Sequence, residues 1–404
     1  MMVTMTRPAQ ARRHPGTTAE VFWVFLRLGL TSFGGPVAHL AYFREAFVQR
    51  RRWLSDEAYA DLVALCQFLP GPGSSQVSMV IGLRRAGWSG LLAAWVAFTL
   101  PSAILLVAFA YGVAAFGDVS GAGWLDGVKA AAVAVVAQAV IQMARTLTPD
   151  LSRLVIAAVG AGVLLVVASP VTQIAVIVLG GLVGWLWLRP DHPEAVRTLA
   201  RVSHRGGVLA LTAFTTLLVA LPVLAAVTDD PALRLADIFY RTGALVFGGG
   251  HVVLPLLEAQ TVQTGLLDGD TFLAGYGAAQ AVPGPLFTFS AYLGASMESA
   301  PNGVLGAAIA LVAVFLPAGL LVVGVLPFWD RLRQAPAARS VVMGVNAAVV
   351  GILAAALYDP VITHGLVSPG TVAIAVAVFV SQWWSRVPIW VAVVAAAVLG
   401  QLLL

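Results

Sequence analysis

The chain has few charged residues. Asp, Glu, Lys and Arg make up 10% of its 404 residues, whereas a soluble globular protein has about 25%. That is too little charge to cover the surface of a water-soluble enzyme of this length. Hydrophobic residues account for 59% and the mean hydropathy is +0.90. Several continuous apolar stretches approach or exceed the roughly 20 residues that cross a bilayer as a helix. Because these stretches are continuous rather than alternating, the sequence predicts an all-α polytopic membrane protein and not an outer-membrane barrel.

Cysteine and nucleotide-binding motifs are also scarce. Cys66 is the single cysteine, which excludes an internal disulfide and a multi-thiolate metal site. The G-x-x-x-x-G-K-[ST] motif is absent, so the chain is not expected to hydrolyse ATP. We therefore expect no enzyme activity, no cofactor and no metal. The basic residues lie in short loops rather than in one stripe, so nucleic acid is not an expected partner. Residues 1–20 are polar and no cleavage site follows, so no removable signal peptide is expected.

Two segments of the chain resemble each other. Residues 25–35 match residues 239–249, with Phe33 and Phe247 lying 214 positions apart. The pattern Gln-x-x-Pro-Gly-Pro at residues 67–72 returns at 280–285, 213 positions later. Pro101 corresponds to Pro317, and the segment that contains Lys129 corresponds to the segment that contains Asn346. Matching arginine, glutamine and Pro-Gly-Pro at a nearly constant offset predicts an internal duplication.

Loop charges indicate how the two copies are oriented. Short loops that are rich in Lys and Arg stay in the cytoplasm. The early loops of the first copy are basic and its later loop, 117–126, holds Asp118 and Asp126. In the second copy the early loop is acidic and the later loop, 328–340, is basic. We therefore predict two inverted-topology repeats, the architecture of many secondary transporters, with the N-terminus in the cytoplasm and the C-terminus outside. The basic residues of these loops are Arg44, Arg50, Arg51, Arg52, Arg84, Arg85, Arg331, Arg333 and Arg339.

These patterns predict four regions: a cytoplasmic tail (1–20), a first transporter repeat (21–189), a linker (190–235) with a connecting transmembrane helix at 208–227, and a second, inverted repeat (236–404). Glycine and proline interrupt 20–86 and 236–300, which predicts broken or re-entrant helical hairpins. Whether these hairpins cross the membrane fully stays open. Full spans are expected at 87–116, 123–146, 151–168, 170–189, 208–227, 303–327, 338–358, 366–384 and 387–404.

The helix breaks are the expected binding site. Pro70 and Pro72 end a helix near Leu69, and Ser74 or Ser75 is expected to cap a new one. A break at membrane depth is tolerated only inside protein or beside a wet cavity, and a helix N-terminus suits an anion. Pro283-Gly-Pro285 repeats this break, and 33–36 and 247–250 add two more. Proline kinks without a ligand are the alternative.

Polar residues within apolar segments add further candidates. Arg27 and Arg241 are related by the repeat and have no evident carboxylate neighbour in sequence, so each could compensate an anion's charge. Arg27 could instead extend to the interface. Lys129, related to the neutral Asn346, could sense the anion or anchor among headgroups. Gln67 and Gln280 could donate to an oxyanion or satisfy the broken backbone.

A coupling proton has candidate carriers near the breaks. His39 and His251 titrate near neutral pH when unperturbed, although a hydrogen-bonded structural role is the simpler interpretation. Asp61 and Glu258 are alternative carriers, with solvation in a loop as the simpler interpretation of both.

The motifs Ser-Phe-Gly-Gly-Pro, Pro-Gly-Pro-Gly and Phe-Gly-Gly-Gly-His-Val-Val-Leu-Pro, in this order and duplicated, resemble the chromate ion transporter family in its long, two-domain form. The resemblance covers nearly the whole chain. It implies a multi-pass secondary transporter of the inner membrane that exports chromate and confers chromate resistance. Composition and spacing alone indicate only an anion site in an inverted repeat. The copies differ at Pro36/Gly250, Gly73/Leu286 and Lys129/Asn346, which argues against a strictly symmetric site.

Taken together, the expected partners are chromate or a sulfate-like oxyanion and the lipid bilayer, with a homodimer left open. A passive channel or exchanger for other anions such as sulfate is the alternative function. The candidate substrate-binding residues are Arg27, Phe33, Gly34, Gly35, Pro36, Gln67, Pro70, Gly71, Pro72, Gly73, Ser74, Ser75, Lys129, Arg241, Phe247, Gly248, Gly249, Gly250, Gln280, Pro283, Gly284, Pro285 and Asn346.

Overall fold

The computed structural model describes residues 16–115, 122–189, 202–385 and 387–404. Throughout these ranges the regular structure is helical, without strands. Three expectations fall outside them: most of the N-terminal tail, the loop residue Asp118, and most of the basic stretch between Arg189 and Arg205.

Long apolar helices dominate the described part of the chain. Six are long and apolar enough to cross a membrane, which confirms the all-α polytopic class. They are α4 (Gly73–Ala115), α5 (Gly123–Leu147), α7 (Pro170–Trp187), α8 (His204–Thr228), α13 (Gly303–Val325) with its extension through η4 (Leu326–Phe328) and α14 (Trp329–Leu332), and α15 (Pro336–Ala356) with η5 (Leu357–Ile362) and α16 (Thr363–Gly365).

Three of the nine expected full spans are shorter helices: α6 (Leu151–Val166), α17 (Pro369–Val380) and α18 (Ile389–Leu403). Helix α6 begins at the expected residue and ends two residues early, whereas α17 and α18 begin three and two residues late. Asp150 caps α6 and Ser368 caps α17, while η6 (Ser381–Ser385) and Pro388 separate α17 from α18. The expected span at 87–116 is the second arm of α4, beyond a kink at Ala86 and Gly87.

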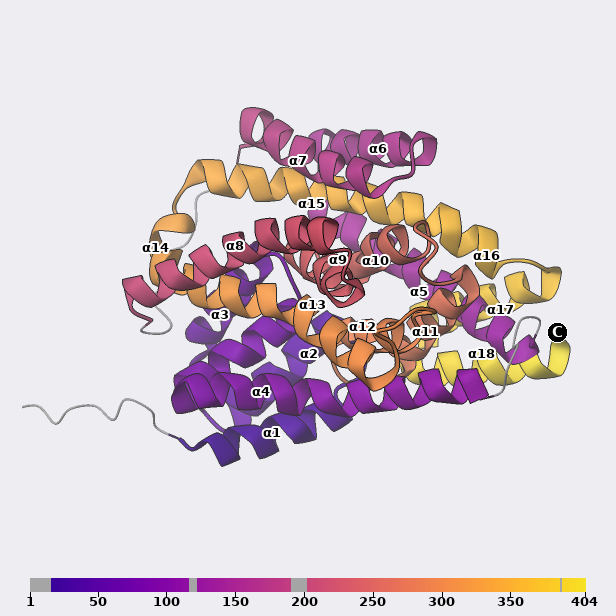
Figure 1. Cartoon of the computed structure of the whole chain (residues 1–404), viewed down its shortest axis with the longest axis horizontal. Coiled ribbons are helices and arrows are strands. Elements are labelled where there is room, and N and C mark those ends of the chain that lie inside the picture. Colours follow the sequence, from indigo (N-terminus) through magenta and orange to yellow (C-terminus); the bar gives the residue numbers. More distant parts are fainter. Residues whose placement is uncertain (1–15, 116–121, 190–201, 386) are drawn as a thin grey trace, which may run out of the picture.

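The two interrupted regions are chains of short helices that end at the expected glycines and prolines. The first contains α1 (Thr18–Thr31), α2 (Gly35–Arg44), η1 (Glu45–Arg50) and α3 (Asp56–Phe68). The second contains α9 (Pro231–Leu245), η2 (Gly250–Val252), α10 (Val253–Thr261), α11 (Gly269–Ala281), η3 (Leu286–Thr288) and α12 (Phe289–Ala295). In Figure 1 the long helices run along the longest axis, and several short helices, α9 to α12, appear in the middle of the view.

The two copies exchange their last helices. The first copy's α5 packs against α17 and α18 of the second, while the second copy's α15 packs against α6 and α7 of the first. Gly127 lies directly on the backbone of Ala396, and Gly344 lies directly on that of Gly180. Small residues permit such close helix approach where no hydrophobic force acts between helices in lipid. Because Gly127 and Gly344 are 217 positions apart, both copies use the same contact.

Aromatic packing fixes the first hairpin. Phe25 on α1 contacts Phe43, at 5.8 Å between ring centroids, and both contact Phe98 of α4. All three side chains are fully buried. Burying rings of this size supplies much of the packing energy, so the short α1 and α2 are held against the long α4.

Candidate substrate site at the helix breaks

The four helix breaks meet in one place. The amide of Gly71 donates to the carbonyl oxygen of Val246 at 2.6 Å, and the amide of Gly284 donates to that of Ser32 at 2.9 Å. Gly71 and Gly284 are 213 positions apart, and Ser32 and Val246 are 214 apart, so each copy donates the same bond to the other. We call the four segments, residues 32–36, 69–73, 246–250 and 282–286, the junction.

The tips of the junction require glycine. Gly71 has φ +115° and Gly284 has φ +104°, which L-residues with a Cβ rarely adopt. A Cβ on Gly71 would lie 3.0 Å from the Cβ of Ala318, and one on Gly284 would lie 2.8 Å from Ser102 Oγ. Each tip is therefore seated on a spanning helix of the other copy.

The N-terminus of α4 opens inside the junction. Its first intrahelical bond runs from the amide of Gln76 to the carbonyl of Pro72, at 2.9 Å, so the preceding amides of Gly73, Ser74 and Ser75 have no helical acceptor. The expectation that Ser74 or Ser75 caps this helix is wrong. The helix begins at Gly73, so both serines fall within its first turn.

Buried polar atoms without partners gather at this helix end. The hydroxyls of Ser32 and Ser75 and the Oε1 atom of Gln76 belong to fully buried residues and have no hydrogen-bond partner. Leaving such a group unpaired costs about 1–3 kcal/mol, so their gathering around one helix N-terminus indicates a place for a ligand or water. Gln76 Nε2 donates to the carbonyl of Pro70 at 2.8 Å and so satisfies part of the broken turn.

Gln76 was missed at the sequence level, where Gln67 was chosen instead. Gln67 is exposed and lines a surface cavity of about 720 Å³ with Leu40 and Arg44. Its repeat mate Gln280 is buried, and its Nε2 atom has no partner. The signal for Gln76 was its place in the first turn after the break, where side chains return toward the helix start.

His39 connects the two breaks of the first copy. Its Nδ1 lies 3.3 Å from Ser74 Oγ and its Nε2 lies 3.2 Å from the carbonyl oxygen of Ser32. A neutral imidazole that donates from Nε2 and accepts at Nδ1 satisfies both contacts. His251 Nδ1 lies 2.9 Å from Tyr276 Oη. Both histidines are thus hydrogen-bonded beside breaks, and proton coupling through them stays a prediction.

The charged candidates already have partners or lie at the surface. Arg241 forms an ion pair with Asp237 one helical turn earlier, which corrects the sequence interpretation that no carboxylate was near. Asp237 is 5% exposed, so the pair neutralises a buried carboxylate, although Asp237 Oδ1 and Arg241 Nε have no hydrogen-bond partner. Arg27 is exposed on α1, unlike the buried polar groups of the junction.

Lys129 and its repeat mate Asn346 differ in burial and in hydrogen bonding as well as in charge. Lys129 is buried and its Nζ lies 2.7 Å from Asp126 and 3.1 Å from Asp270. Asn346 is half-buried and its Oδ1 has no partner. The ammonium group of Lys129 is already paired with two carboxylates, so the arrangement favours a structural role for Lys129 over anion binding.

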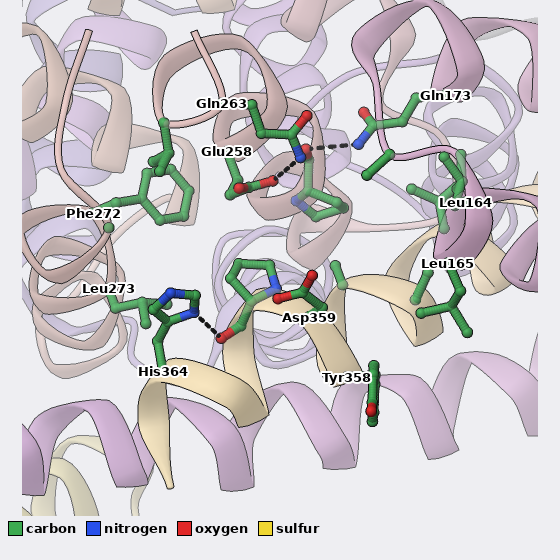
Figure 2. A pocket seen from close by; sticks show the side chains of 18 of the residues that line it. Leu164, Leu165, Gln173, Glu258, Gln263, Phe272, Leu273, Tyr358, Asp359 and His364 are labelled. Atoms are coloured by element: carbon green, nitrogen blue, oxygen red, sulfur yellow. Dashed lines mark hydrogen bonds between the residues drawn. The ribbon is translucent and has the colours of Figure 1, made fainter. Parts of the chain in front are cut away.

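A cavity of about 1040 Å³ lies away from the junction, between α10, α11 and η5 (Figure 2). Its lining includes Glu258, Asp268, Asp270, Asp359 and His364. Glu258 Oε2 accepts a hydrogen bond from Gln263 at 3.0 Å. A concave surface with this many carboxylates repels anions, so the cavity does not suit a dianion as a resting site.

Comparison with known proteins identifies the family. The Chromate transporter family model matches residues 19–185 and again residues 233–401. The chain belongs to the chromate transporter family. Its two matches each contain one half of the junction.

Several curated relatives of this family are similar along most of their length. A chromate transport protein of Pseudomonas aeruginosa is 29% identical, covering 96% of this chain and 93% of that protein. A chromate transport protein of Cupriavidus metallidurans is 29% identical over 84% of this chain and 82% of its own. An uncharacterized transporter of Methanocaldococcus jannaschii is 23% identical over 88% of this chain and 87% of its own. No solved structure matches the chain.

Proposed function

We propose that this chain is a secondary active transporter that exports chromate across the inner membrane and so confers chromate resistance. The observation that carries the proposal is the buried N-terminus of α4, with the unpartnered hydroxyls of Ser32 and Ser75 beside it. Family membership and relatives named chromate transport proteins support chromate as the anion.

The proposed site binds its anion with neutral donors. Chromate is a tetrahedral dianion whose oxygens accept hydrogen bonds. The amides of Gly73, Ser74 and Ser75, the serine hydroxyls and the partial positive charge of a helix N-terminus suit such a group. Arg27 and Arg241 then act at a distance or not at all. A site whose donors are all neutral should bind a dianion with moderate affinity, which allows the anion to be released after transport.

The proposed transport cycle moves the copies relative to each other. The junction forms between them, so rocking one copy against the other would open it first to one side and then to the other. We propose repeats at 21–189 and 236–404 that are inverted in the membrane, with the N-terminus in the cytoplasm and the C-terminus outside, as the arginine-rich loops suggest.

Accumulation of labelled chromate tests the function directly. Cells that express the protein should retain less chromate than cells with an empty vector, and a Ser75→Ala variant should retain nearly as much as the vector control. Thr288→Ala is the matched control, because Thr288 occupies a similar place after the second tip but its hydroxyl already donates to Pro285. Equal retention with and without the wild-type protein would refute export.

Energy coupling and selectivity need a purified system. In proteoliposomes, a secondary transporter should move chromate against its gradient only when a proton gradient or membrane potential is applied. Transport that only equalises concentrations would support the passive channel or exchanger. Sulfate has the same charge and shape as chromate, so we expect it to compete.

A further inference from the structure

The two copies are joined by a buried polar cluster on α3. Asp61 Oδ1 accepts hydrogen bonds from Trp329 Nε1 at 3.0 Å and from Arg333 Nη1 at 3.2 Å. Asp61 and Trp329 are each 5% exposed. Asp61 belongs to the first copy, and Trp329 and Arg333 belong to the second. We call these three residues the Asp61 clasp.

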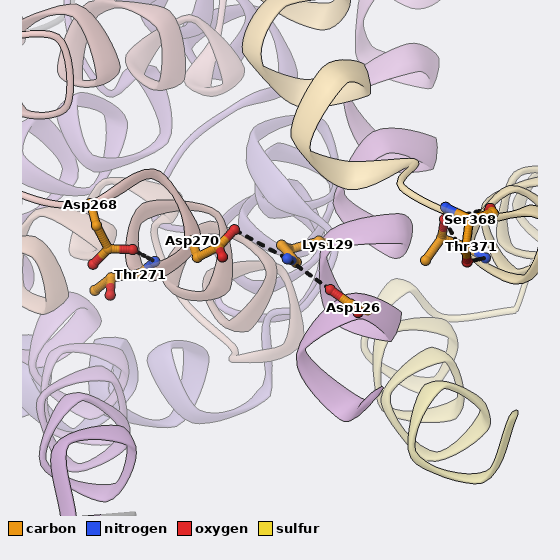
Figure 3. A network of polar contacts seen from close by, with 7 residues as sticks. All are labelled: Asp126, Lys129, Asp268, Asp270, Thr271, Ser368 and Thr371. Carbon is orange, nitrogen blue, oxygen red and sulfur yellow. Dashed lines mark hydrogen bonds and ion pairs between the residues drawn. The ribbon is translucent and has the colours of Figure 1, made fainter. Parts of the chain in front are cut away.

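A second cluster joins the copies through α11. Lys129 of the first copy forms ion pairs with Asp126 of its own helix and with Asp270 of the second copy (Figure 3). The side chain of Lys129 is 6% exposed. We call Lys129 and Asp270, the pair that joins the copies, the Lys129 clasp.

Both clasps hold the same part of the hairpin. Helix α3 ends at Phe68, just before Pro70, and helix α11 ends at Ala281, just before Pro283. Each helix is the arm that leads to a Pro-Gly-Pro tip of the junction. Figure 1 places α3 and α14 toward one end of the long helices, and α11 toward the other end, beside the end of the bundle where α17 and α18 lie.

The residues of the two clasps are not repeat mates. At the offset of 213, Asp61 corresponds to Ala274 and Asp270 corresponds to Glu57. Duplication alone therefore does not explain why both arms carry a carboxylate that reaches a cation of the other copy. The feature that the two clasps share is that each attaches an arm of one copy to the other copy.

Release of either clasp has a clear consequence. Opening the Asp61 clasp takes both donors away from a buried carboxylate, and an uncompensated buried charge is costly. Opening the Lys129 clasp takes only Asp270 from an ammonium group that keeps Asp126, so it costs less. Each arm therefore stays on the other copy while its clasp is intact. With both clasps closed, both arms that lead to the junction are tied to the other copy. We propose that the Asp61 clasp and the Lys129 clasp are the two gates of the transport cycle, located on opposite membrane faces and released alternately.

Reporters of gate opening are available at equivalent positions. Cys66, the single cysteine, is buried on α3 between Asp61 and Pro70. Its repeat counterpart, 213 positions later, is Ala279, which is buried on α11. The wild-type Cys66 reports on the first arm, and an Ala279→Cys variant in a Cys66→Ser background reports on the second arm.

The experiment measures labelling by a membrane-impermeant maleimide added from either side of membrane vesicles. Asp61→Asn should raise labelling of Cys66 about tenfold from one side only, as the open state grows from about 1% to about 10%. Asp270→Asn should raise labelling of Ala279→Cys from the opposite side only. Trp329→Phe keeps the ring that packs against Phe68 and removes one hydrogen bond, so it should give an intermediate increase without loss of folding.

Matched controls separate gating from general loosening. Asp56, at the start of α3, forms an ion pair with Arg44 of α2, so Asp56→Asn breaks a contact of the same arm within one copy. Asp126→Asn removes only the same-copy partner of Lys129. We expect Asp56→Asn to change the labelling of Cys66, and Asp126→Asn the labelling of Ala279→Cys, far less than Asp61→Asn and Asp270→Asn do. Unchanged labelling in both Asp61→Asn and Trp329→Phe, or exposure of both reporters from one side, would overturn the proposal.

The gate inference rests on the proposed transport function, yet the labelling needs no chromate. Side-specific labelling without chromate export would retain the gates and refute the exporter. Export without any side-specific labelling would retain the exporter and refute the gates.

Discussion

At the tip of the first copy, the first arm of α4 begins at Gly73 and reaches the kink at Ala86 and Gly87, and the hydroxyl of Ser75 has no partner. At the tip of the second copy, Leu286 replaces that glycine, a 3-10 turn precedes a seven-residue α12, and Thr288 Oγ1 donates to the carbonyl of Pro285 at 2.7 Å. The backbone bonds of the two tips match, but their side chains do not.

This difference indicates that the two copies kept the same backbone hydrogen bonds at the junction but not the same polar side chains. The amides of Gly71 and Gly284 still donate across the junction in the same way. The open donors belong to the first copy's long helix, whereas the second copy contributes the buried Gln280 from α11. A single asymmetric anion site therefore fits the junction better than two equal ones.

The largest expected effect is on stability, and it tests whether the backbones of the two tips are equally constrained. Gly71→Ala and Gly284→Ala should each lower the free energy of unfolding by about 3 kcal/mol, because strained φ values cost about 1–3 kcal/mol and the new Cβ atoms meet Ala318 and Ser102. Gly265→Ala, at φ +71° with open space around it, should cost only the strain. Thermal unfolding in detergent measures all three, and a mild effect at one tip alone would show that the constraints differ.

The next effect compares the related arginines. Arg241→Gln should destabilise the protein by about 2 kcal/mol, less than a fully buried pair because the arginine is partly exposed. Arg27→Gln should stay within about 0.5 kcal/mol, as is usual for an exposed position. The double variant Asp237→Asn/Arg241→Gln should recover stability, and failure to recover would assign Arg241 another role.

A smaller effect separates the two tips by function. Ser75→Ala should weaken chromate binding about tenfold, since a hydrogen bond to a charged group is worth about 1.5–3 kcal/mol, while leaving thermal stability unchanged. Thr288→Ala should leave binding unchanged and lower stability by about 1 kcal/mol, because it removes a satisfied bond. Competition binding with chromate measures the first effect, and equal binding losses would argue for a symmetric site.

The smallest effect concerns two helix caps that are related by the repeat. Asp150 caps α6, and Ser368, 218 positions later, caps α17. The backbone amide of Arg153, and then its side chain, hold the pKa of Asp150 below the ordinary value. A depressed carboxyl pKa stabilises the folded state above about pH 4, the ordinary aspartate range, and this contribution is lost as pH falls through the folded pKa.

Asp150→Ser should therefore remove a small acid-dependent part of the stability and keep the cap, since serine caps nearly as well. Unfolding curves at pH 7 and pH 3 compare the variant with the wild type. An unchanged acid dependence would mean that Asp150 does not titrate differently on folding.

Much of the fold was readable from the sequence. The paired prolines and glycines of the Pro-Gly-Pro motifs end helices, so the ends of α3 and α11 fell where Pro70 and Pro283 predicted. Single prolines do not, since Pro101 and Pro317 lie inside α4 and α13. Hydropathy gave the helical membrane class. Three of the nine expected spans are shorter apolar helices, α6, α17 and α18, and that they cross the membrane stays a prediction. The homodimer and the orientation of the termini stay predictions.

The binding candidates were readable only in part. The breaks were correctly found by residue type, but the choice of Gln67 over Gln76 depended on which side of each short helix faces inward. The Asp237 partner of Arg241 follows from i,i+4 spacing and was available in the sequence. Asp126, three positions before Lys129, was likewise available, but the partners of Asp61 and the second partner of Lys129, Asp270, lie 141 or more positions away and were not.

The sequence by itself determined the helix breaks at the Pro-Gly-Pro and Phe-Gly-Gly motifs, because a missing amide and a missing Cβ are local properties of proline and glycine. It also determined that the chain enters lipid, because too few charges exist to face water. Only the tertiary structure decided that four separate stops share one junction, and which polar side chains there lack a partner. Those properties depend on hydrogen bonds and contacts between residues more than one hundred positions apart, and no local pattern specifies them.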